Sequence, residues 1–333
     1  MPGPYIASKS KQRGSPMRTI TALFVGLGSI GTRHLKNLTN LCADRGWTLQ
    51  ADALRSDLSR PLRDGVAALL HAQYTDLADA PAHYDMVFIT NPTSLHADAL
   101  TRVRGRGGAL FIEKPIFSAD QTGLDLADCL PAGQKAYVAA PMRWCGVMLA
   151  LKDRLPGLHP YCARVICSSY LPDWRPGVDY RTVYSAHKAM GGGVTIDLIH
   201  EWDYLVELFG VPEQLYNFKG TYSDLEIDSD DLSVYIARYP TLLAEVHLDY
   251  FGRGYRRSIE LFCHDGSYLA DFGAGTLTLP DGTVQHYEED VNRRYEREME
   301  YFVDYALTGS GKSCNPPALA LNVLKLTLGE NVQ

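Results

Sequence analysis

Residues 21–31 read TALFVGLGSIG, an apolar and β-prone run that breaks into the pattern G-x-G-x-x-G. Residues 32–38 continue the chain with helical spacing. A strand, a glycine turn and a helix, in that order, form the context in which this pattern predicts dinucleotide binding. The free N–H groups and the positive dipole end of the helix would face the phosphates. We expect contacts to the cofactor from Gly26, Gly28, Ser29, Ile30 and Gly31; an ordinary structural turn is the alternative.

The bulk composition sets limits on the class of protein. At 333 residues, the chain is long enough for two domains, each with its own core. Hydrophobic residues make up 46% and charged residues 21%, as in globular proteins, and no apolar run approaches the roughly 18–20 residues of a membrane helix. The formal net charge of −7 argues against a nucleic-acid partner. We expect neither a membrane nor a nucleic acid as partner, although small anionic ligands remain compatible with this charge.

The cysteines and the first residues give little sign of special chemistry. The seven cysteines are scattered and none forms a C-x-x-C pair, so neither a metal site nor a disulfide framework is indicated. They are typical of buried thiols in a reducing cytoplasm, where we expect this protein. Residues 1–16 contain several Gly, Pro, Ser and basic residues and resemble a disordered leader or tag.

The end of the second predicted strand, residues 47–54, bears on the choice of cofactor. A carboxylate there would bind the adenosine ribose and favour NAD, whereas an arginine with a small polar neighbour would suit the 2′-phosphate of NADP. Arg55 and Ser56 follow the strand, while Asp52 comes somewhat early and Asp57 somewhat late. We therefore favour NADP over NAD, with an exposed arginine at a strand end as the alternative interpretation.

Strand and helix patterns alternate up to residue 140. Continuous apolar runs at 86–90, 108–112 and 135–140 are typical of buried parallel strands. Helical patterns occupy 60–71, 95–103 and 124–130. The alternation predicts a doubly wound parallel sheet, and so a Rossmann domain over residues 17–140.

From residue 141 the pattern changes to period-two alternation. Six strands are predicted, at 163–170, 214–222, 232–239, 242–249, 257–264 and 268–270. Hairpin turns are expected at 239–241 and 264–267. One long helix at 194–209 and two closing helices at 295–307 and 318–328 complete the pattern. The fold class is therefore α/β, with a mostly antiparallel sheet in a second domain, residues 141–333.

Two clusters contain residues suited to catalysis. Lys114 follows a buried parallel strand, between Glu113 and Pro115, where open α/β sheets place ligands. There it could donate a hydrogen bond to a substrate oxygen, or it could be a surface lysine in a loop. Asp197 and His200 lie three residues apart at the start of the long predicted helix, after three glycines. A histidine beside a carboxylate can act as a general base, although a buried His–Asp pair would serve packing alone.

A third cluster suits the binding of a substrate. Residues 170–181 form a predicted loop dense in aromatic, arginine and proline residues, including Trp174, Arg175, Tyr180 and Arg181. Aromatic rings stack on sugars and arginines bind carboxylates or phosphates, although an oligomer contact is the alternative. Arg143 follows the last predicted Rossmann strand and also falls where a substrate would lie.

Taken in order, these stretches resemble the Gfo/Idh/MocA family, the group of glucose-fructose oxidoreductase and inositol dehydrogenase. The resemblance covers residues 17–333 and depends on the glycine turn, on Asn91 and Pro92 with His96, on the Glu113–Lys114–Pro115 motif, and on the helix start with Asp197 and His200. Many members place this histidine four residues after the aspartate, whereas here the gap is three. The loop at 174–181 looks like a subgroup associated with bacterial surface-sugar biosynthesis.

The resemblance implies a nicotinamide cofactor, a sugar-like substrate and a second domain whose open sheet forms a homodimer or homotetramer. By position, Lys114 corresponds to the family's catalytic lysine, Asp197 to its substrate-binding aspartate and His200 to its proton-transferring histidine. Asn91, Pro92, His96 and Glu113 correspond to cofactor contacts.

We therefore expect an NAD(P)-dependent oxidoreductase that acts on a hydroxyl or keto carbon of a sugar, a sugar acid or a nucleotide-linked sugar. Two alternatives remain open. One is an enzyme that uses transient oxidation for epimerisation or glycoside cleavage, and the other is an inactive NAD(P)-binding sensor or regulatory protein.

Overall fold

The computed structural model describes residues 18–308 and 311–332, so the leader predicted at 1–16 lies outside the described residues. The chain forms two compact units. Unit 1 contains the residues up to Glu113, together with Asp125–Ala139 and Tyr295–Pro316. Unit 2 contains Lys114–Leu124, Ala140–Arg294 and the residues from Pro317 onward. Each unit is thus built from separate stretches, whereas the predicted domains 17–140 and 141–333 are continuous.

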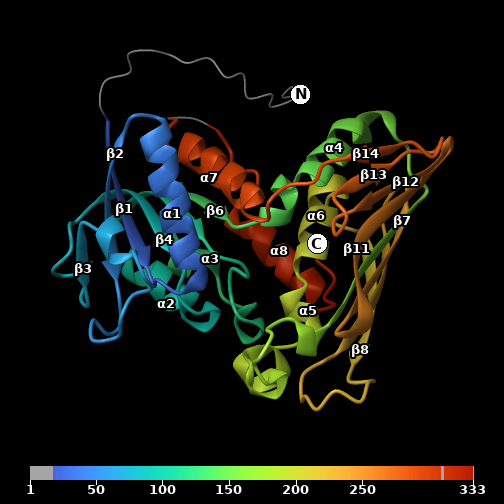
Figure 1. The fold of residues 1–333 in the computed structure, drawn as a ribbon, viewed down its shortest axis with the longest axis horizontal. Helices are drawn as coiled ribbons and strands as arrows, with labels where there is room; N and C mark the ends of the chain where they lie inside the picture. Colours follow the sequence, from blue (N-terminus) through green and yellow to red (C-terminus); the bar gives the residue numbers. More distant parts are fainter. Residues whose placement is uncertain (1–17, 309–310, 333) are drawn as a thin grey trace. The chain divides into compact units, whose positions relative to one another are not determined.

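Unit 1 is organised around a six-stranded parallel sheet (Figure 1). Its strands are β1 (Thr19–Val25), β2 (Thr48–Leu54), β3 (Ala72–Tyr74), β4 (Tyr84–Ile89), β5 (Gly107–Ile112) and β6 (Lys135–Val138). Their spatial order, β3-β2-β1-β4-β5-β6, reverses direction at β1, which is the doubly wound topology. The predicted Rossmann sheet is confirmed, and β1 lies at the position where such sheets bind dinucleotides.

Four helices accompany this sheet in the described residues, namely α1 (Ser29–Asp44), α2 (His96–Arg102), α3 (Leu126–Cys129) and α7 (Asn292–Leu307). The last of these joins the unit from the far end of the sequence. The ring of Phe302 on α7 meets the rings of Phe88 and Phe111 edge-on, with centroids 5.4 and 5.1 Å apart. Aromatic packing therefore attaches α7 to β4 and β5.

Unit 2 contains an eight-stranded sheet in the order β14-β13-β12-β11-β7-β10-β9-β8. Its strands are β7 (Cys162–Tyr170), β8 (Gln214–Gly220), β9 (Leu232–Arg238), β10 (Leu243–Asp249), β11 (Phe251–Cys263), β12 (Gly266–Asp271), β13 (Thr276–Thr278) and β14 (Val284–His286). Only β7 and β10 pair in parallel; the other neighbours are antiparallel. The predicted α/β fold class, with a second and mostly antiparallel sheet, is confirmed.

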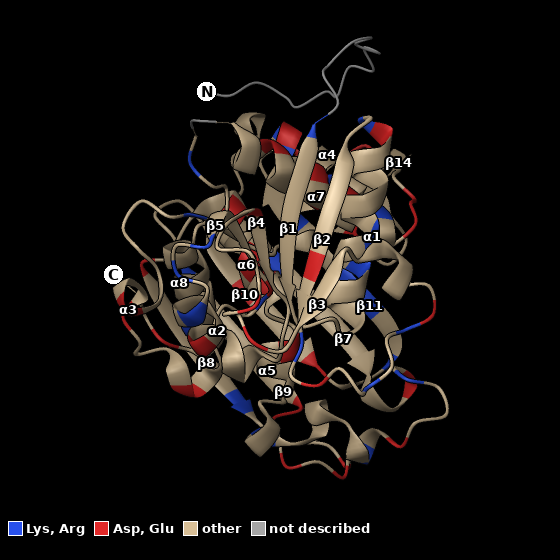
Figure 2. Ribbon diagram, turned by 90° about the vertical axis from the view of Figure 1, so that its left-hand side faces the viewer, with Lys and Arg blue, Asp and Glu red and all other residues tan. Residues whose placement is uncertain are grey.

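One face of the second sheet carries the helices α4 (Gly146–Arg154), α5 (Val194–Asp197), α6 (His200–Phe209) and α8 (Pro317–Thr327) (Figure 1). Strand β10 shows the consequence, because Ala244, Val246 and Leu248 are buried while Leu243 on the opposite face is exposed. Acidic and basic positions are interspersed along the ribbon in both units (Figure 2). No helix among the described residues is long and apolar enough to span a bilayer.

Three predictions of local structure were wrong. The helix expected at 60–71 is reduced to a 3-10 turn at Ala67–Leu69, because Pro61 and the positive φ of Gly65 (76°) interrupt the run. The single helix expected at 194–209 is two helices, α5 and α6, separated at Leu198 and Ile199. Both of these residues are buried, so packing bends the chain without a proline or glycine. The short strands β3, β13 and β14 were not predicted, since three residues carry too little periodicity.

Candidate functional site

The glycine turn between β1 and α1 meets the backbone demands of a dinucleotide site. Gly26 has a φ of +85°, and a Cβ on it would lie 2.8 Å from the Cα of Asn91. A Cβ on Gly31 would lie 2.6 Å from Oγ1 of Thr90 and 2.7 Å from the carbonyl oxygen of Gly26. Any side chain at these two positions would push apart the turn, the helix and the end of β4.

Gly28 differs from Gly26 and Gly31 because it faces open space. No atom lies within 4 Å of the position that a Cβ on Gly28 would occupy. The first turn of α1 has no capping side chain and no acidic residue. Its N–H groups and its positive dipole end are therefore available to an anion, which is the arrangement that binds a pyrophosphate. The turn fits the phosphates of a nicotinamide dinucleotide.

Polar atoms around the turn also suit a bound cofactor. Among the described residues, Oγ1 of Thr32 and Oδ1 of Asn91 are buried without a hydrogen-bond partner. The backbone oxygen of Asn91 lies 3.1 Å from Nε2 of His96, which fixes the segment that follows Pro92. Buried polar atoms usually find partners, so these two oxygens are candidates for contact with a ligand.

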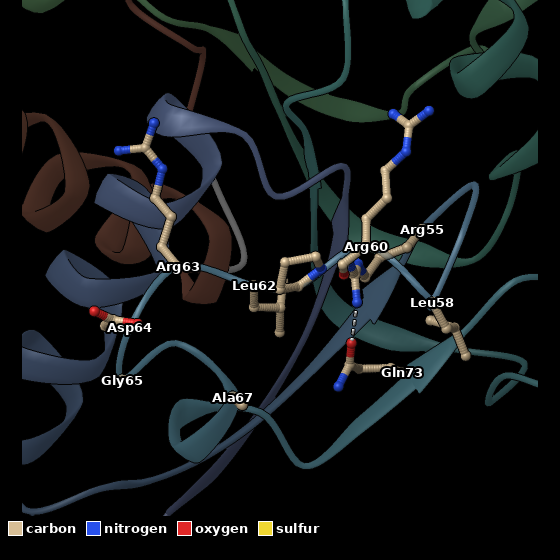
Figure 3. Close-up of a pocket in the computed structure, with 10 residues that line it drawn as sticks. Arg55, Leu58, Arg60, Leu62, Arg63, Asp64, Gly65, Ala67 and Gln73 are labelled. Atoms are coloured by element: carbon tan, nitrogen blue, oxygen red, sulfur yellow. Dashed lines mark hydrogen bonds between the residues drawn. The ribbon is translucent and has the colours of Figure 1, made fainter.

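The end of β2 carries three arginines around a pocket of about 410 Å³ (Figure 3). Arg55 donates to Oε1 of Gln73 at 2.8 Å and to the backbone oxygen of Arg60. Arg60 and Arg63 lie in the loop that follows β2 and also line the pocket, and Ser56 is exposed next to Arg55. The pocket is therefore cationic and can accept a phosphate.

Two of the acids near this pocket, Asp52 and Asp57, are engaged elsewhere, while Asp64 lines the pocket itself. Asp52 is buried in the sheet, where it accepts a hydrogen bond from the hydroxyl of Tyr84 at 2.8 Å and lies 3.1 Å from Nδ1 of His71. Asp57 accepts hydrogen bonds from the backbone and the hydroxyl of Ser59, and the hydrogen bonds from Ser59 lower the pKa of its carboxyl. Neither acid is free in the way that a ribose-binding carboxylate would need to be.

Unit 2 brings together the residues predicted to act in catalysis. Lys114 directly follows Glu113, and His200 is the first residue of α6. Burial lowers the pKa of His200 well below 6.5, and the positive charges of Lys114, Arg257 and Arg294 lower it further. His200 is therefore a neutral imidazole at neutral pH, which is the protonation state of a general base before proton transfer.

Asp197 is held by two tyrosines, which the sequence did not suggest. The hydroxyl of Tyr184 donates to Oδ1 at 2.8 Å and the hydroxyl of Tyr250 donates to Oδ2 at 2.6 Å. Burial and the charge of Asp197 raise the pKa of Tyr184 to about 12 and that of Tyr250 well above 10. Within the described residues, no hydrogen bond joins Asp197 to His200. The expected His–Asp pair on one continuous helix face is therefore absent, because the chain bends between α5 and α6.

A buried ion pair supports the start of α6. Arg257 on β11 donates through Nε and Nη2 to the two carboxylate oxygens of Glu201, at 2.6 and 3.0 Å. The side chain of Glu201 is fully buried, and the neighbouring carboxylate raises the pKa of Arg257 despite its burial. This pair ties α6 to the sheet one residue after His200. Sequence reasoning missed it because its partners are 56 residues apart.

The aromatic loop has two parts with different surroundings. Trp174 meets Tyr250 edge-on at 5.2 Å, and the guanidinium of Arg175 lies 5.5 Å from the ring centroid of Tyr184. These two residues therefore contact the tyrosines that hold Asp197. No carboxylate pairs with Arg175 in the part of the chain that the structure describes, so its charge is available.

The other two arginines predicted to bind substrate are already paired. Arg181 forms ion pairs with Asp179 and Glu226, while the hydroxyl of nearby Tyr180 accepts from the backbone of Glu226 at 3.2 Å. Arg143 is buried. It binds both carboxylate oxygens of Asp203 at 2.8 Å and a third oxygen, from Glu207, at 2.6 Å. The expectation that Arg143 contacts substrate needs correction, since its guanidinium is committed to these acids.

Comparison with known proteins identifies the N-terminal part of the chain. A family model described as "Oxidoreductase family, NAD-binding Rossmann fold" (GFO_IDH_MocA) matches residues 20–138. The Rossmann domain belongs to the Gfo/Idh/MocA family. The family match spans the glycine turn and the Glu113–Lys114–Pro115 motif, and so agrees with the predicted resemblance. No curated protein matches the sequence significantly.

Solved structures share the fold of this chain over nearly its whole length. An oxidoreductase from Agrobacterium radiobacter, in complex with NAD+, L-tartaric acid and magnesium, has a TM-score of 0.75 at 16% identity and covers 93% of this chain and 95% of its own. The WlbA dehydrogenase from Bordetella pertussis, in complex with NADH and UDP-GlcNAcA, has a TM-score of 0.71 at 18% identity, covering 94% and 95%. Apo scyllo-inositol dehydrogenase from Lactobacillus casei has a TM-score of 0.71 at 17% identity, covering 95% and 96%.

Proposed function

We propose that this protein is an NAD(P)-dependent dehydrogenase or reductase that acts on a hydroxyl or keto carbon of a sugar, a sugar acid or a nucleotide-linked sugar. The observation that carries the proposal is the neutral His200, whose pKa is lowered in part by the charge of Lys114. A base without a proton and a cation close enough to affect it are the two groups that oxidation of an alcohol requires. The dinucleotide turn in unit 1 and the sugar-related ligands of the structural neighbours favour oxidation or reduction of a sugar over other reactions that use a histidine and a lysine.

Each residue of unit 2 would have a distinct role. When bound, the nicotinamide accepts or returns the hydride. His200 takes the proton from the substrate hydroxyl in the direction of oxidation and returns it in reduction. The ammonium of Lys114 donates a hydrogen bond to the same oxygen and stabilises its alkoxide character. Asp197, fixed by Tyr184 and Tyr250, accepts a hydrogen bond from another hydroxyl of the sugar and orients the ring.

The edges of the site supply specificity in this proposal. Trp174 offers a ring to the sugar, and Arg175, which has no carboxylate partner among the described residues, attracts an anionic group of the substrate. Tyr180 and Arg181 belong to the same loop, and their contacts with Glu226 would hold its shape. In unit 1, Arg55, Ser56, Arg60 and Arg63 favour the 2′-phosphate of NADP, because the three arginines outnumber the one carboxylate, Asp64, that lines the pocket.

We also propose that the protein assembles as a homodimer or homotetramer through the second sheet. Tyr216 and Phe218 on β8 are 57% and 73% exposed, and Ile236 on the neighbouring strand β9 is 37% exposed. The register places Tyr216 opposite Ile236, so these apolar side chains share the face that the helices leave uncovered. Phe218→Glu should lower the mass measured by light scattering, and an unchanged mass would count against this face as the interface.

The test of the proposed reaction is a substrate screen of the purified chain. The panel contains scyllo-inositol, UDP-N-acetylglucosamine, its uronic acid and free sugar acids, each with NAD and with NADP, and absorbance reports the reduced nicotinamide. We expect turnover of at least one compound, with a loss in Lys114→Ala of about 100-fold or more. Full turnover by both Lys114→Ala and His200→Ala, with normal cofactor binding, would overturn the assignment. A cofactor that co-purifies and is never consumed would indicate transient oxidation.

A further inference from the structure

A buried histidine on the cofactor helix contacts the residue that precedes Lys114. His34 is the sixth residue of α1 and its side chain is fully buried. Its Nε2 donates to Oε1 of Glu113 at 2.5 Å, a short hydrogen bond. Glu113 itself is held in the sheet, since its backbone N–H donates to the carbonyl oxygen of Ile89 at 2.9 Å. The next residue along the chain is Lys114.

Packing alone does not account for a histidine at this position. The imidazole lies against Phe111, with ring centroids 4.6 Å apart, and meets Tyr295 on α7 edge-on at 6.1 Å. A leucine could fill such an apolar space without burying nitrogen atoms. Within the described residues, Nδ1 of His34 has no hydrogen-bond partner, so the protein bears the cost of an unsatisfied buried atom. The bond to Glu113 is the feature that only a polar side chain provides.

We propose that His34 is a positioning residue that holds Glu113, and through it the peptide leading into Lys114, in place relative to the helix that begins at the glycine turn. The inference rests on the proposed function, because it assumes that Lys114 contacts the reacting oxygen. A shift of about 1 Å in a catalytic group can lower the rate about 100-fold. A fixed Glu113 side chain would prevent such a shift, since one peptide bond separates it from Lys114.

Two substitutions that differ by one methylene group separate positioning from packing. The amide nitrogen of asparagine reaches the place of Nδ1 and cannot contact Glu113, whereas the longer glutamine reaches the place of Nε2. With the substrate identified by the screen, we expect His34→Asn to lower kcat about 10- to 100-fold relative to the wild type. His34→Gln should have a kcat close to that of the wild type. The affinity for NADPH, measured by nicotinamide fluorescence, should change less than about threefold in both variants, because the glycine turn is intact.

A readout without substrate follows the backbone directly. Hydrogen–deuterium exchange of residues 113–117 should be faster in His34→Asn than in the wild type, and close to the wild type in His34→Gln. His71→Ala is the control, since it removes another histidine–carboxylate contact of unit 1, from Nδ1 to Asp52 at 3.1 Å. It should leave both kcat and the exchange of residues 113–117 unchanged. Should His34→Asn fail to fold, Glu113→Asp withdraws the carboxylate from the other side. Its readout is the exchange of residues 113–117 alone, which should again be faster than in the wild type, because Glu113 is also an expected cofactor contact.

The outcomes distinguish this inference from the proposed function. In a Lys114→Ala background, His34→Asn should cause no further loss of kcat, because its effect passes through Lys114. Equal losses in the Asn and Gln variants, or unchanged exchange of residues 113–117 in His34→Asn, would overturn the positioning role. If Lys114→Ala itself keeps full turnover, the proposed function fails, whatever the exchange measurement shows.

Discussion

The two candidate sites are made of different chemical groups. In unit 1, the turn at Gly26–Gly31 offers backbone N–H groups and open space, and its glycines matter for the volume that they lack. In unit 2, the groups that matter are side chains, a neutral His200 and a carboxylate of Asp197 held by two hydroxyls. The first site should therefore be sensitive to added atoms, and the second to removed atoms. Each expectation below tests one side of this difference.

The largest effect is expected from removing the base of unit 2. His200→Asn keeps a polar side chain of similar volume but cannot accept a proton at neutral pH. We expect kcat to fall by about 100- to 10,000-fold, the range typical of general acid–base catalysis. The affinity for NADPH should stay within about threefold of the wild type, since the dinucleotide turn is untouched. A variant that keeps more than a tenth of the wild-type kcat would remove His200 from the proton-transfer role.

The lowered pKa of His200 also predicts how stability depends on pH. The unfolded chain binds a proton at this residue near the ordinary value of 6.5, whereas the folded chain resists protonation to a much lower pH. The unfolded state therefore holds more protons below about pH 6.5, and the free energy of unfolding falls as the pH drops through this window. His200→Asn should flatten the pH dependence of Tm between about 5 and 6.5. An unchanged slope would show that His200 titrates normally.

Two glycine variants test the other side of the comparison. Gly28→Ala adds a methyl group in open space, so Tm should stay unchanged while cofactor affinity falls about 10- to 100-fold, because lost contacts between N–H groups and phosphates cost about 1.5–3 kcal/mol. Gly31→Ala places its methyl group 2.6 Å from Oγ1 of Thr90 and should cost about 1–3 kcal/mol of stability. Thermal unfolding and fluorescence titration measure the two quantities. Equal loss of Tm in both variants would contradict the difference between these glycines.

The contact between Tyr250 and Asp197 gives a smaller effect. Tyr250→Phe removes one donor from the carboxylate and leaves the packing with Trp174 nearly intact. We expect kcat/KM to fall about tenfold, which corresponds to about 1.4 kcal/mol, the lower end of the contribution of a hydrogen bond to a charged group. Tyr235→Phe is a suitable control, since that hydroxyl donates to the backbone of Thr327 and should affect only Tm. No change in kcat/KM for Tyr250→Phe would show that the substrate does not depend on the orientation of Asp197.

The sequence revealed the two sites unequally, for a physical reason. The glycine turn is local, so eleven consecutive residues contain its strand, its turn and its helix start. The surroundings of Asp197 are not local, because its donors lie 13 and 53 positions away and meet it only through the register of β10 and β11 and the course of the loop. The ion pairs of Arg143 could not be predicted from the sequence either, because their partners are also far apart along the chain. Their acids lie 60 and 64 residues further along the chain, and a charged residue after a strand looked free.

The smallest effect is expected at the adenosine end of the cofactor site, where the side chain is partly exposed. Arg55→Asp replaces a cation of the three-arginine pocket with the acid that NAD-binding domains use. The preference for NADP over NAD, measured as the ratio of kcat/KM values, should fall about fivefold, since a partly exposed ion pair contributes about 1 kcal/mol. Arg104→Asp is the control, because it makes the same change of charge in the turn before β5, outside the three-arginine pocket. It should leave the cofactor preference unchanged. Because salt screens exposed ion pairs, the effect of Arg55→Asp on the cofactor preference should also be smaller at 0.5 M salt. If neither the substitution nor the salt changes the ratio of kcat/KM values for NADP and NAD, Arg55 does not select the cofactor.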